Sequence, residues 1–202
     1  MLLTDRLTPS FYRSQKSQEI LLDFYEKGEE IALLNTGIWQ VYRGVVQLSK
    51  IDVSGKKIIL GWVTSGHVFD NQKDESVIYH AQAMSDVYVR CLTPQYLRIY
   101  PQLVTELIAK LSYRLIQTQK LLTIAAIKLV EDRLWELLSM LKEEMGQPVS
   151  NGTRLTVRFT HQNIANVIGA TRVTVTRVLG EFQTKNWIEF DSDRHIIIKS
   201  KK

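Results

Sequence analysis

The chain contains neither glycine nor proline between Gln102 and Met145, and this stretch strongly constrains the fold. Such a segment favours long helices, because glycine and proline are the residues that most readily end or kink them. Residues at alternating steps of three and four form a stripe within it: Val104, Leu107, Leu111, Arg114, Thr118, Leu121 and Ala125. This spacing is typical of a coiled-coil seam and predicts a long dimerisation helix and a homodimer.

Arg114 and Thr118 interrupt the apolar stripe. Burying an unpaired arginine costs several kcal/mol, so a plain core helix does not explain this residue. Two interpretations remain open: Arg114 faces an anionic ligand or partner group near the centre of a dimer, or it turns to solvent or pairs with an acid. A hinge is predicted near Ala125-Ala126, with a second amphipathic helix over 129–145.

Short strand-like segments separated by glycines and polar turns precede the helical stretch. They cover residues 41–43, 45–49, 57–63, 77–83 and 87–91. Asp52-Val53-Ser54-Gly55 is typical of a hairpin turn between two of them. Regular short strands of this kind predict an antiparallel barrel or sandwich, and the whole chain is therefore of the α+β class.

The positive charge of the chain is concentrated near its C-terminus. Residues 153–202 contain nine Lys or Arg against four Asp or Glu, which accounts for the whole net charge of +5. This is the electrostatic pattern of a nucleic-acid-binding module, although a membrane surface or an acidic protein would also suit it.

A short helix, a glycine turn and a second helix are predicted between about 160 and 180. Thr160 and Thr171 are good N-caps, and Gly169 occupies the turn, where positive φ is tolerated. Small Ala165 suits a close helix crossing. The remaining apolar positions give each helix one buried face: Ile164 and Ile168 in the first, and Val175, Val178 and Leu179 in the second.

The exposed residues near the start of the second helix suit DNA recognition in the major groove. Arg172 and Arg177 are predicted to donate to guanine O6 and N7, and Val173 to contact a thymine methyl group. Phosphate contacts are predicted for Thr160, Gln162, Thr171 and Thr174. Residues 187–190 and 195–199 read as two strands joined by a polar turn, the wing of a winged helix. The alternative is an ordinary helical hairpin with solvated arginines.

Several classes of protein are not expected. Cys91 is the only cysteine, which argues against a disulfide framework and a cysteine-ligated metal cluster. No nucleophile–base or metal-ligand constellation is present, and packing roles are expected for the four histidines (His67, His80, His161 and His195), so we expect no enzyme and no metal. No apolar run reaches the roughly 20 residues of a membrane helix, and the N-terminus lacks the pattern of a secretion signal.

Three phrases, HQNIANVIGATRVTVTRVLGEF, SYRLIQTQ and IYHAQAM, resemble the cyclic-AMP receptor/FNR (CRP/FNR) superfamily, and within it the cyanobacterial global nitrogen regulators of the NtcA type. The resemblance implies an N-terminal antiparallel β-roll like those that bind cyclic nucleotides (1–98), a dimerisation helix (99–126) and a winged helix-turn-helix domain (127–202). It implies a homodimeric activator of nitrogen-responsive genes that binds a palindromic promoter site in double-stranded DNA and contacts RNA polymerase. It also assigns groove reading to Arg172, Val173 and Arg177.

The resemblance also bears on an effector. Cyclic AMP is not expected, because the Gly-Glu and Arg-Ser/Thr phosphate cassette is absent from residues 66–72 and no arginine precedes Ala81. Regulators of the NtcA type bind 2-oxoglutarate with an arginine that corresponds to Arg114, which implies an effector site at Arg114, Thr118 and Tyr79.

Three departures put this effector in question. This chain has Val77 where the family has its second arginine, and Gln119 where the family has a glutamate on the helix. Residues 70–72 replace the family's Gly-Val-Leu loop. With one cation left for a dianion, we expect a decayed site or a changed effector, and no cofactor.

Two alternatives for the function remain. The chain either controls another regulon with a changed or lost effector site, or is a cyclic-nucleotide-like binding module without DNA. The basic C-terminal segment argues against the second. The excess of isoleucine over alanine suits an A+T-rich genome, and the expected compartment is the plastid stroma (chloroplast) or a bacterial cytoplasm.

Overall fold

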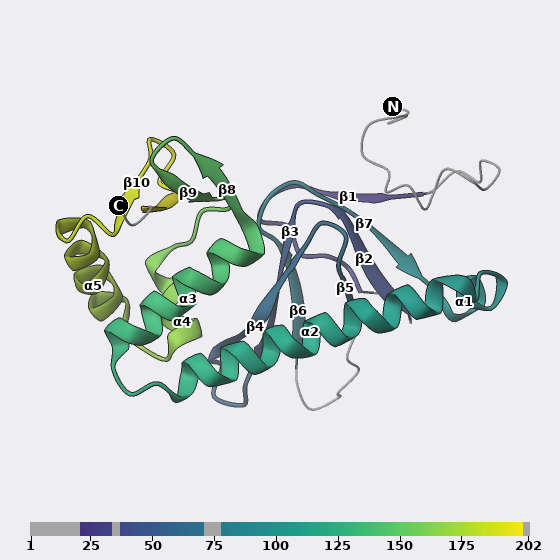
Figure 1. Ribbon diagram of the computed structural model, residues 1–202. Helices are drawn as coiled ribbons and strands as arrows, with labels where there is room; N and C mark the ends of the chain where they lie inside the picture. Colours follow the sequence, from purple (N-terminus) through teal and green to yellow (C-terminus); the bar gives the residue numbers. More distant parts are fainter. Residues whose placement is uncertain (1–20, 34–36, 71–77, 200–202) are drawn as a thin grey trace.

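A computed structural model describes residues 21–33, 37–70 and 78–199 of the protein (Figure 1). A β-rich domain lies along one side of a long helix. A smaller unit of helices and short strands lies at the C-terminal end of that helix (Figure 1). The β-rich part comprises β1 (Asp23–Tyr25), β2 (Ile38–Arg43), β3 (Val45–Ile51), β4 (Lys57–Thr64), β5 (Val68–Asp70), β6 (Ile78–Ala83), β7 (Val87–Leu92) and α1 (Pro94–Ile99). The remainder comprises α2 (Gln102–Ala126), α3 (Val130–Met145), β8 (Gly146–Val149), β9 (Gly152–Leu155), α4 (His161–Ile168), α5 (Arg172–Thr184), β10 (Ile188–Phe190) and β11 (Ile196–Lys199).

The β-rich domain consists of two antiparallel sheets that face each other. Their strand orders are β1-β7-β2-β5 and β4-β3-β6. Alternating residues of the strands point inward and form a buried core that includes Trp39, Val41, Val46, Leu48 and Phe69. The antiparallel β-architecture and the predicted hairpin are confirmed, and the Asp52 side chain accepts hydrogen bonds from the backbone of Ser54 and Lys56. The short elements β1, β5 and α1 were not predicted.

Gly44 separates β2 from β3 because no other residue fits there. Its φ is +93°, and a Cβ on it would lie 2.3 Å from the carbonyl oxygen of Asp86.

Cys91 is half-buried in β7, and burial raises the pKa of its thiol. Three residues of the sequence argument, Asn71, Gln72 and Val77, lie outside the described residues.

The long helix α2 ends at the predicted hinge. After Ala126 the backbone of Ile127 becomes extended (φ −66°, ψ 134°), and α3 begins three residues later at Val130. No helix of the described ranges is long and apolar enough to cross a membrane.

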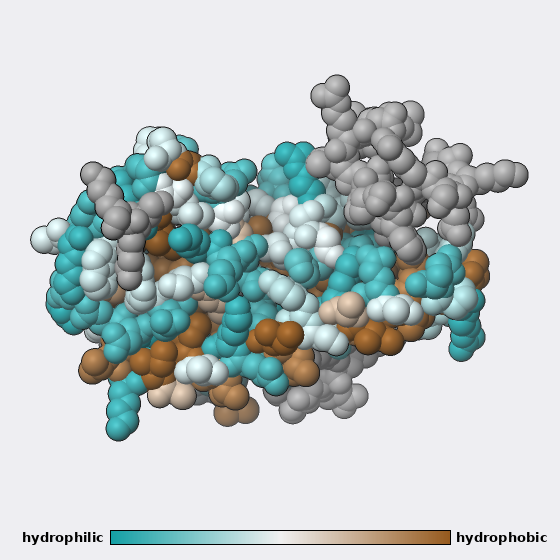
Figure 2. Space-filling view, in the orientation of Figure 1, coloured by the Kyte–Doolittle hydropathy of each residue, from teal (hydrophilic) through white to brown (hydrophobic). Residues whose placement is uncertain are grey.

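Two neighbouring stripes on α2 correct the predicted seam. The inward stripe packs on the β-domain and consists of Leu103, Leu107, Arg114, Gln117, Leu121 and Ile124, of which Leu107 is 5% exposed. The outward stripe consists of Val104, Ile108, Leu111, Leu115, Thr118 and Leu122. Hydrophobic side chains gather along the lower edge of Figure 2, where α2 runs in Figure 1. The predicted seam was wrong at Leu107, Arg114 and Leu121, which face their own chain.

Both stripes follow heptad spacing, so spacing alone could not separate them. They lie side by side on one helix, and the predicted seam ran between them, taking members from each. The outward stripe, which retains Val104, Leu111 and Thr118 of the prediction, is the apolar surface that a second copy of α2 can bury.

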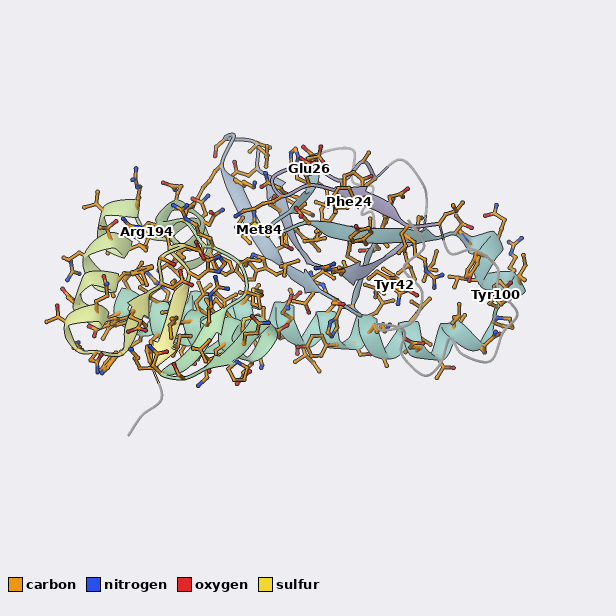
Figure 3. All side chains as sticks on the ribbon, turned by 90° about the horizontal axis from the view of Figure 1, so that it is seen from above. Phe24, Glu26, Tyr42, Met84, Tyr100 and Arg194 are labelled. Carbon is orange, nitrogen blue, oxygen red and sulfur yellow. The ribbon has the colours of Figure 1, made fainter. Side chains whose placement is uncertain are left out.

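The C-terminal unit is a helical layer on a four-stranded sheet of order β10-β11-β9-β8. Residues 146–152 form β8, a turn and the start of β9. Trp62 of β4 packs edge-on against Phe159 with ring centroids 5.4 Å apart, so the unit shares a core with the β-domain. Figure 3 shows Tyr100 at one end of the molecule and Arg194 in the C-terminal unit at the other.

Candidate DNA-binding surface and ligand cavity

The helices α4 and α5 form the predicted helix-turn-helix. Thr160 caps α4 through a reciprocal capping box, in which its hydroxyl accepts from the Asn163 amide and the Asn163 side chain accepts from the Thr160 amide. Gly169 ends α4 in the left-handed conformation (φ 62°, ψ 42°), and Thr171 caps α5. These features confirm the predicted cap and turn residues, and buried Ala165 confirms the small residue at the crossing.

The first turn of α5 projects from the surface. Arg172 is exposed, and Val173 is 79% exposed. Arg177 lies one turn further on and is held by Glu181 in an i,i+4 ion pair. The three residues predicted to read bases therefore share one exposed part of the helix, although Arg177 must leave Glu181 to reach a base.

The residues predicted to contact phosphate lie around the same helix ends. Gln162 is exposed, and its amide donates to Asn166 (2.8 Å). Thr171 and Thr174 bond each other through their hydroxyls at 2.9 Å. The hydroxyl of Thr160 serves the cap. Each group is close to a helix N-terminus, where backbone amides and the helix dipole favour anions.

His161 was not predicted as a site residue, yet it joins the two helices. Its Nδ1 lies 2.7 Å from the Thr176 hydroxyl, and that hydroxyl donates to the Arg172 carbonyl oxygen (2.9 Å). A hydroxyl has one proton, so Nδ1 of His161 must be the donor to Thr176. Burial and, secondarily, the charge of Arg172 lower the pKa of His161, which favours the neutral ring.

The predicted wing is present as the antiparallel pair β10 and β11. Asp191 organises its turn by accepting from the backbone amides of Asp193 (3.0 Å) and His195 (2.8 Å) and from the Arg154 side chain (2.6 Å). These bonds hold the pKa of Asp191 below its ordinary value, the Arg154 bond being the largest cause. Trp187 precedes the strand instead of starting it and packs on Phe182.

A cavity of about 360 Å³ lies between the β-domain and the outward side of α2. Arg114, Tyr79 and Thr118, the three predicted effector residues, all line it. Its other lining residues are Leu48, Lys50, Leu60, Phe69, Asp70, Leu111 and Leu115. The structure thus brings together residues from β3, β4, β5, β6 and α2 that are far apart in the sequence.

Two polar groups of this cavity, Arg114 and Tyr79, are partly buried. Burial lowers the pKa of Arg114, while electrostatic interactions with Tyr79, Glu144 and Asp70 oppose that shift. Arg114 is held in place because one guanidinium nitrogen donates to the Trp62 carbonyl oxygen (3.2 Å) and to Gln117. Burial raises the pKa of Tyr79, so its hydroxyl stays protonated as a donor. Arg114 is only partly exposed, and among the described residues no carboxylate forms an ion pair with it.

Comparisons with known proteins agree with this architecture. Residues 132–202 match the Crp-like helix-turn-helix domain family. The global nitrogen regulator of Synechocystis is 30% identical over 161 residues, covering 75% of this chain and 71% of that protein. The regulatory protein CysR of Synechococcus elongatus is 32% identical over 165 residues, covering 80% and 76%. The chain belongs to the CRP/FNR family of transcription regulators.

Solved structures of the CRP/FNR family show the same fold. A CRP-family transcriptional regulator of Thermus thermophilus superposes with a TM-score of 0.74 at 19% identity, covering 88% of this chain and 92% of that one. In this CRP/FNR regulator, α4 and α5 are the DNA-binding motif, α5 is the recognition helix, and the family arrangement is dimeric.

A hydrogen-bonded relay in this CRP/FNR regulator connects the cavity with the DNA-binding unit. Gln117, which is 2% exposed, accepts from Arg114 and donates to Glu144 at the end of α3 (2.8 Å). Glu144 also accepts from the Tyr113 hydroxyl (2.8 Å). Burial, and secondly this hydrogen bond, raise the pKa of Tyr113 to about 12. Sequence spacing gave no indication of this relay, since Glu144 is distant in sequence from the other members.

Gly61 makes room for the relay beneath α2. A Cβ on Gly61 would lie 2.8 Å from the Gln117 side-chain oxygen and 3.0 Å from the Arg114 guanidinium. Lys50 also lines the cavity and was not predicted as a site residue. It stands opposite Tyr79 in the β3–β6 register, and its position two residues after inward-facing Leu48 is the signal that places it at the cavity.

Proposed function

We propose that this regulator controls nitrogen-responsive genes as a homodimer that binds a palindromic promoter site and contacts RNA polymerase. The support for nitrogen control is the identity with the Synechocystis nitrogen regulator across most of both chains. A regulator of this kind needs no catalytic group, and we propose no enzymatic activity. We place it in a bacterial cytoplasm or a plastid stroma.

The observation that carries DNA recognition is the exposed first turn of α5. Arg172 offers a planar fork of donors that matches guanine O6 and N7, and Val173 offers a methyl-sized apolar surface for thymine. We assign Arg177 to base reading as well, after release from Glu181. Thr160, Gln162, Thr171 and Thr174 are assigned to phosphates, where they set the register without reading sequence.

The outward stripe of α2 supports a symmetric pair of these recognition helices. Two copies that bury this stripe against each other form a twofold dimer, and such a dimer reads two inverted half-sites. In helix-turn-helix dimers the half-sites lie about 34 Å apart, which is one turn of the duplex.

A second candidate is a different regulon. The relative named CysR is as similar to this chain as the nitrogen regulator is, at 32% against 30% identity. The fold and the DNA-binding surface suit either function, so the distinction depends on which DNA sequence is bound.

Selection of bound duplexes from a random library tests the proposed function. We expect enrichment of a palindrome with GTA and TAC half-sites, the pair that the similarity to nitrogen regulators suggests. Enrichment of a different palindrome would support the other regulon. Recovery of duplexes without any twofold symmetry would contradict a homodimer that reads DNA with two α5 helices.

A further inference from the structure

Resting on the proposed function, we propose that His161 contacts a DNA phosphate as an imidazolium, so that each α4–α5 unit takes up one proton when it binds DNA. Thr176 holds the ring through Nδ1, and Nε2 is presented to the phosphate. DNA binding by this regulator is therefore linked to protonation, and it strengthens as the pH falls.

His161 lies at the edge of the exposed face of α5. Its hydrogen-bond partner Thr176 is exposed and lies one helical turn after Arg172, on the same side of α5. His161 is also the first residue of α4, between Thr160 and Gln162, which are both assigned to phosphates. A side chain placed between the groove-reading helix and the phosphate contacts faces the sugar–phosphate wall of the groove.

The hydrogen bonds around Thr176 determine which ring nitrogen is left for DNA. The Thr176 hydroxyl donates its proton to the Arg172 carbonyl oxygen, so it can only accept from Nδ1 of His161. Nδ1 therefore carries a proton in the neutral and in the charged ring, and Nε2 is the nitrogen that titrates. Within the described part of the chain, Nε2 has no hydrogen-bond partner and remains accessible to solvent.

The groups that surround His161 leave its ring without an acid partner. Helix α4 contains no other ionisable side chain, and the neighbour on β10 is the aromatic ring of Phe190, with ring centroids 6.4 Å apart. Glu189 and Asp191, on either side of Phe190, form ion pairs with other side chains. The charge that acts on His161 is that of Arg172, so burial and this cation lower the pKa of the ring in the free protein.

A DNA phosphate reverses this balance. In the neutral ring Nε2 has a lone pair that repels a phosphate oxygen, whereas a protonated Nε2 donates a charge-assisted hydrogen bond to it. The phosphate therefore raises the pKa of His161 in the complex above its lowered value in the free protein. Between these two values binding takes up a proton, and affinity falls as the pH rises. Above both values, and below both, affinity no longer depends on this group.

Fluorescence anisotropy at pH 6 and pH 8, at one fixed salt concentration, measures the linkage. A rise of about one pKa unit changes affinity by up to about tenfold for each ring. Because the dimer contains two copies of His161, we expect it to bind at least about tenfold more tightly at pH 6 than at pH 8. The change should appear on the selected palindrome and on random duplex DNA, since a phosphate is present in both.

Variants of His161 and Thr176 separate the charge from the position of the ring. His161→Gln stays neutral, so it should bind at pH 6 as weakly as the wild type does at pH 8. His161→Arg is charged throughout and should bind equally tightly at both. Thr176→Ser keeps the hydroxyl and should keep the pH dependence, whereas Thr176→Ala should reduce it. His195→Gln removes the other histidine of the C-terminal unit and should retain the pH dependence.

A magnetic resonance titration of the wild-type protein needs no variant to fold. The ring proton signal of His161, assigned by its loss in His161→Gln or by backbone connectivity, should titrate at a higher pH in the DNA complex than in the free protein. An equal or lower midpoint in the complex would overturn the proposal.

Two outcomes of the affinity measurements would also overturn it. The first is a pH dependence in His161→Gln equal to that of the wild type. The second is a loss of affinity in His161→Gln that is the same at both pH values and confined to the selected palindrome, because a neutral ring would then be reading a base. The preference for the selected palindrome over random DNA at pH 8 reports on the proposed function separately.

Discussion

Replacing Ile108 by aspartate is expected to turn the dimer into monomers and to weaken binding to the selected palindrome by about a hundredfold or more. Ile108 is 59% exposed in the outward stripe of α2, so the substitution leaves the fold of one chain intact. In a dimer the aspartates of two chains would face each other in an apolar seam without partners. A monomer loses the gain from joining two half-site contacts, which is commonly 10²- to 10⁴-fold.

Two matched variants make this prediction specific. Ala109→Asp places the same charge on an exposed face of α2 that points away from the stripe, and it should remain a dimer with unchanged DNA affinity. Leu107→Asp places the charge in the core of the β-domain and should unfold the chain rather than separate dimers. Sedimentation velocity and circular dichroism distinguish these results. A dimeric Ile108→Asp protein with wild-type affinity would show that the outward stripe is not the interface.

Arg172→Ala is expected to cost about 1–3 kcal/mol on the selected palindrome, a loss of about 5- to 150-fold, and much less on random duplex DNA. The reason is that a base contact contributes only on the correct sequence, whereas a phosphate contact contributes on every sequence. Arg177→Ala is expected to show the same preference for the selected palindrome. Its loss of binding free energy should be smaller, because the wild-type protein must first release Arg177 from Glu181.

Lys185→Ala is the control for the loss of a positive charge near the other end of α5. Lys185 lies just beyond the C-terminal end of α5 and pairs with Glu131 at 2.6 Å, away from the recognition turn. It should lose little affinity, and equally little on both kinds of DNA. Fluorescence anisotropy at one fixed salt concentration measures all these affinities. Equal losses on selected and random DNA for Arg172→Ala would show that this arginine contacts phosphate only.

The helix-turn-helix could be predicted from sequence because its determinants are local. Thr160, Gly169 and Thr171 set the caps and the turn through contacts within four residues, and the structure has each of them in its expected role. The end of α2 was equally predictable. In these places the backbone conformation depends on neighbours in sequence, so no tertiary information was needed.

The α2 seam and the cavity could not be predicted in the same way, because they depend on contacts between distant segments. Which of two adjacent heptad stripes packs on the β-domain is decided by the placement of α2 on β4 and β5, not by spacing. Lys50 and Glu144 gain their significance only when β3 and α3 meet α2. The strands β8 and β9 were missed because Pro148 and two glycines obscure a hairpin that the sheet partner β11 stabilises.

Changing the spacing between the two half-sites tests whether a symmetric dimer reads DNA through two α5 helices. Inserting about five base pairs at the centre of the selected palindrome rotates one half-site to the opposite face of the duplex, because one turn is about 10.5 base pairs. We expect the affinity of the wild-type protein to fall to that for a single half-site. Unchanged affinity for the lengthened site would contradict this arrangement.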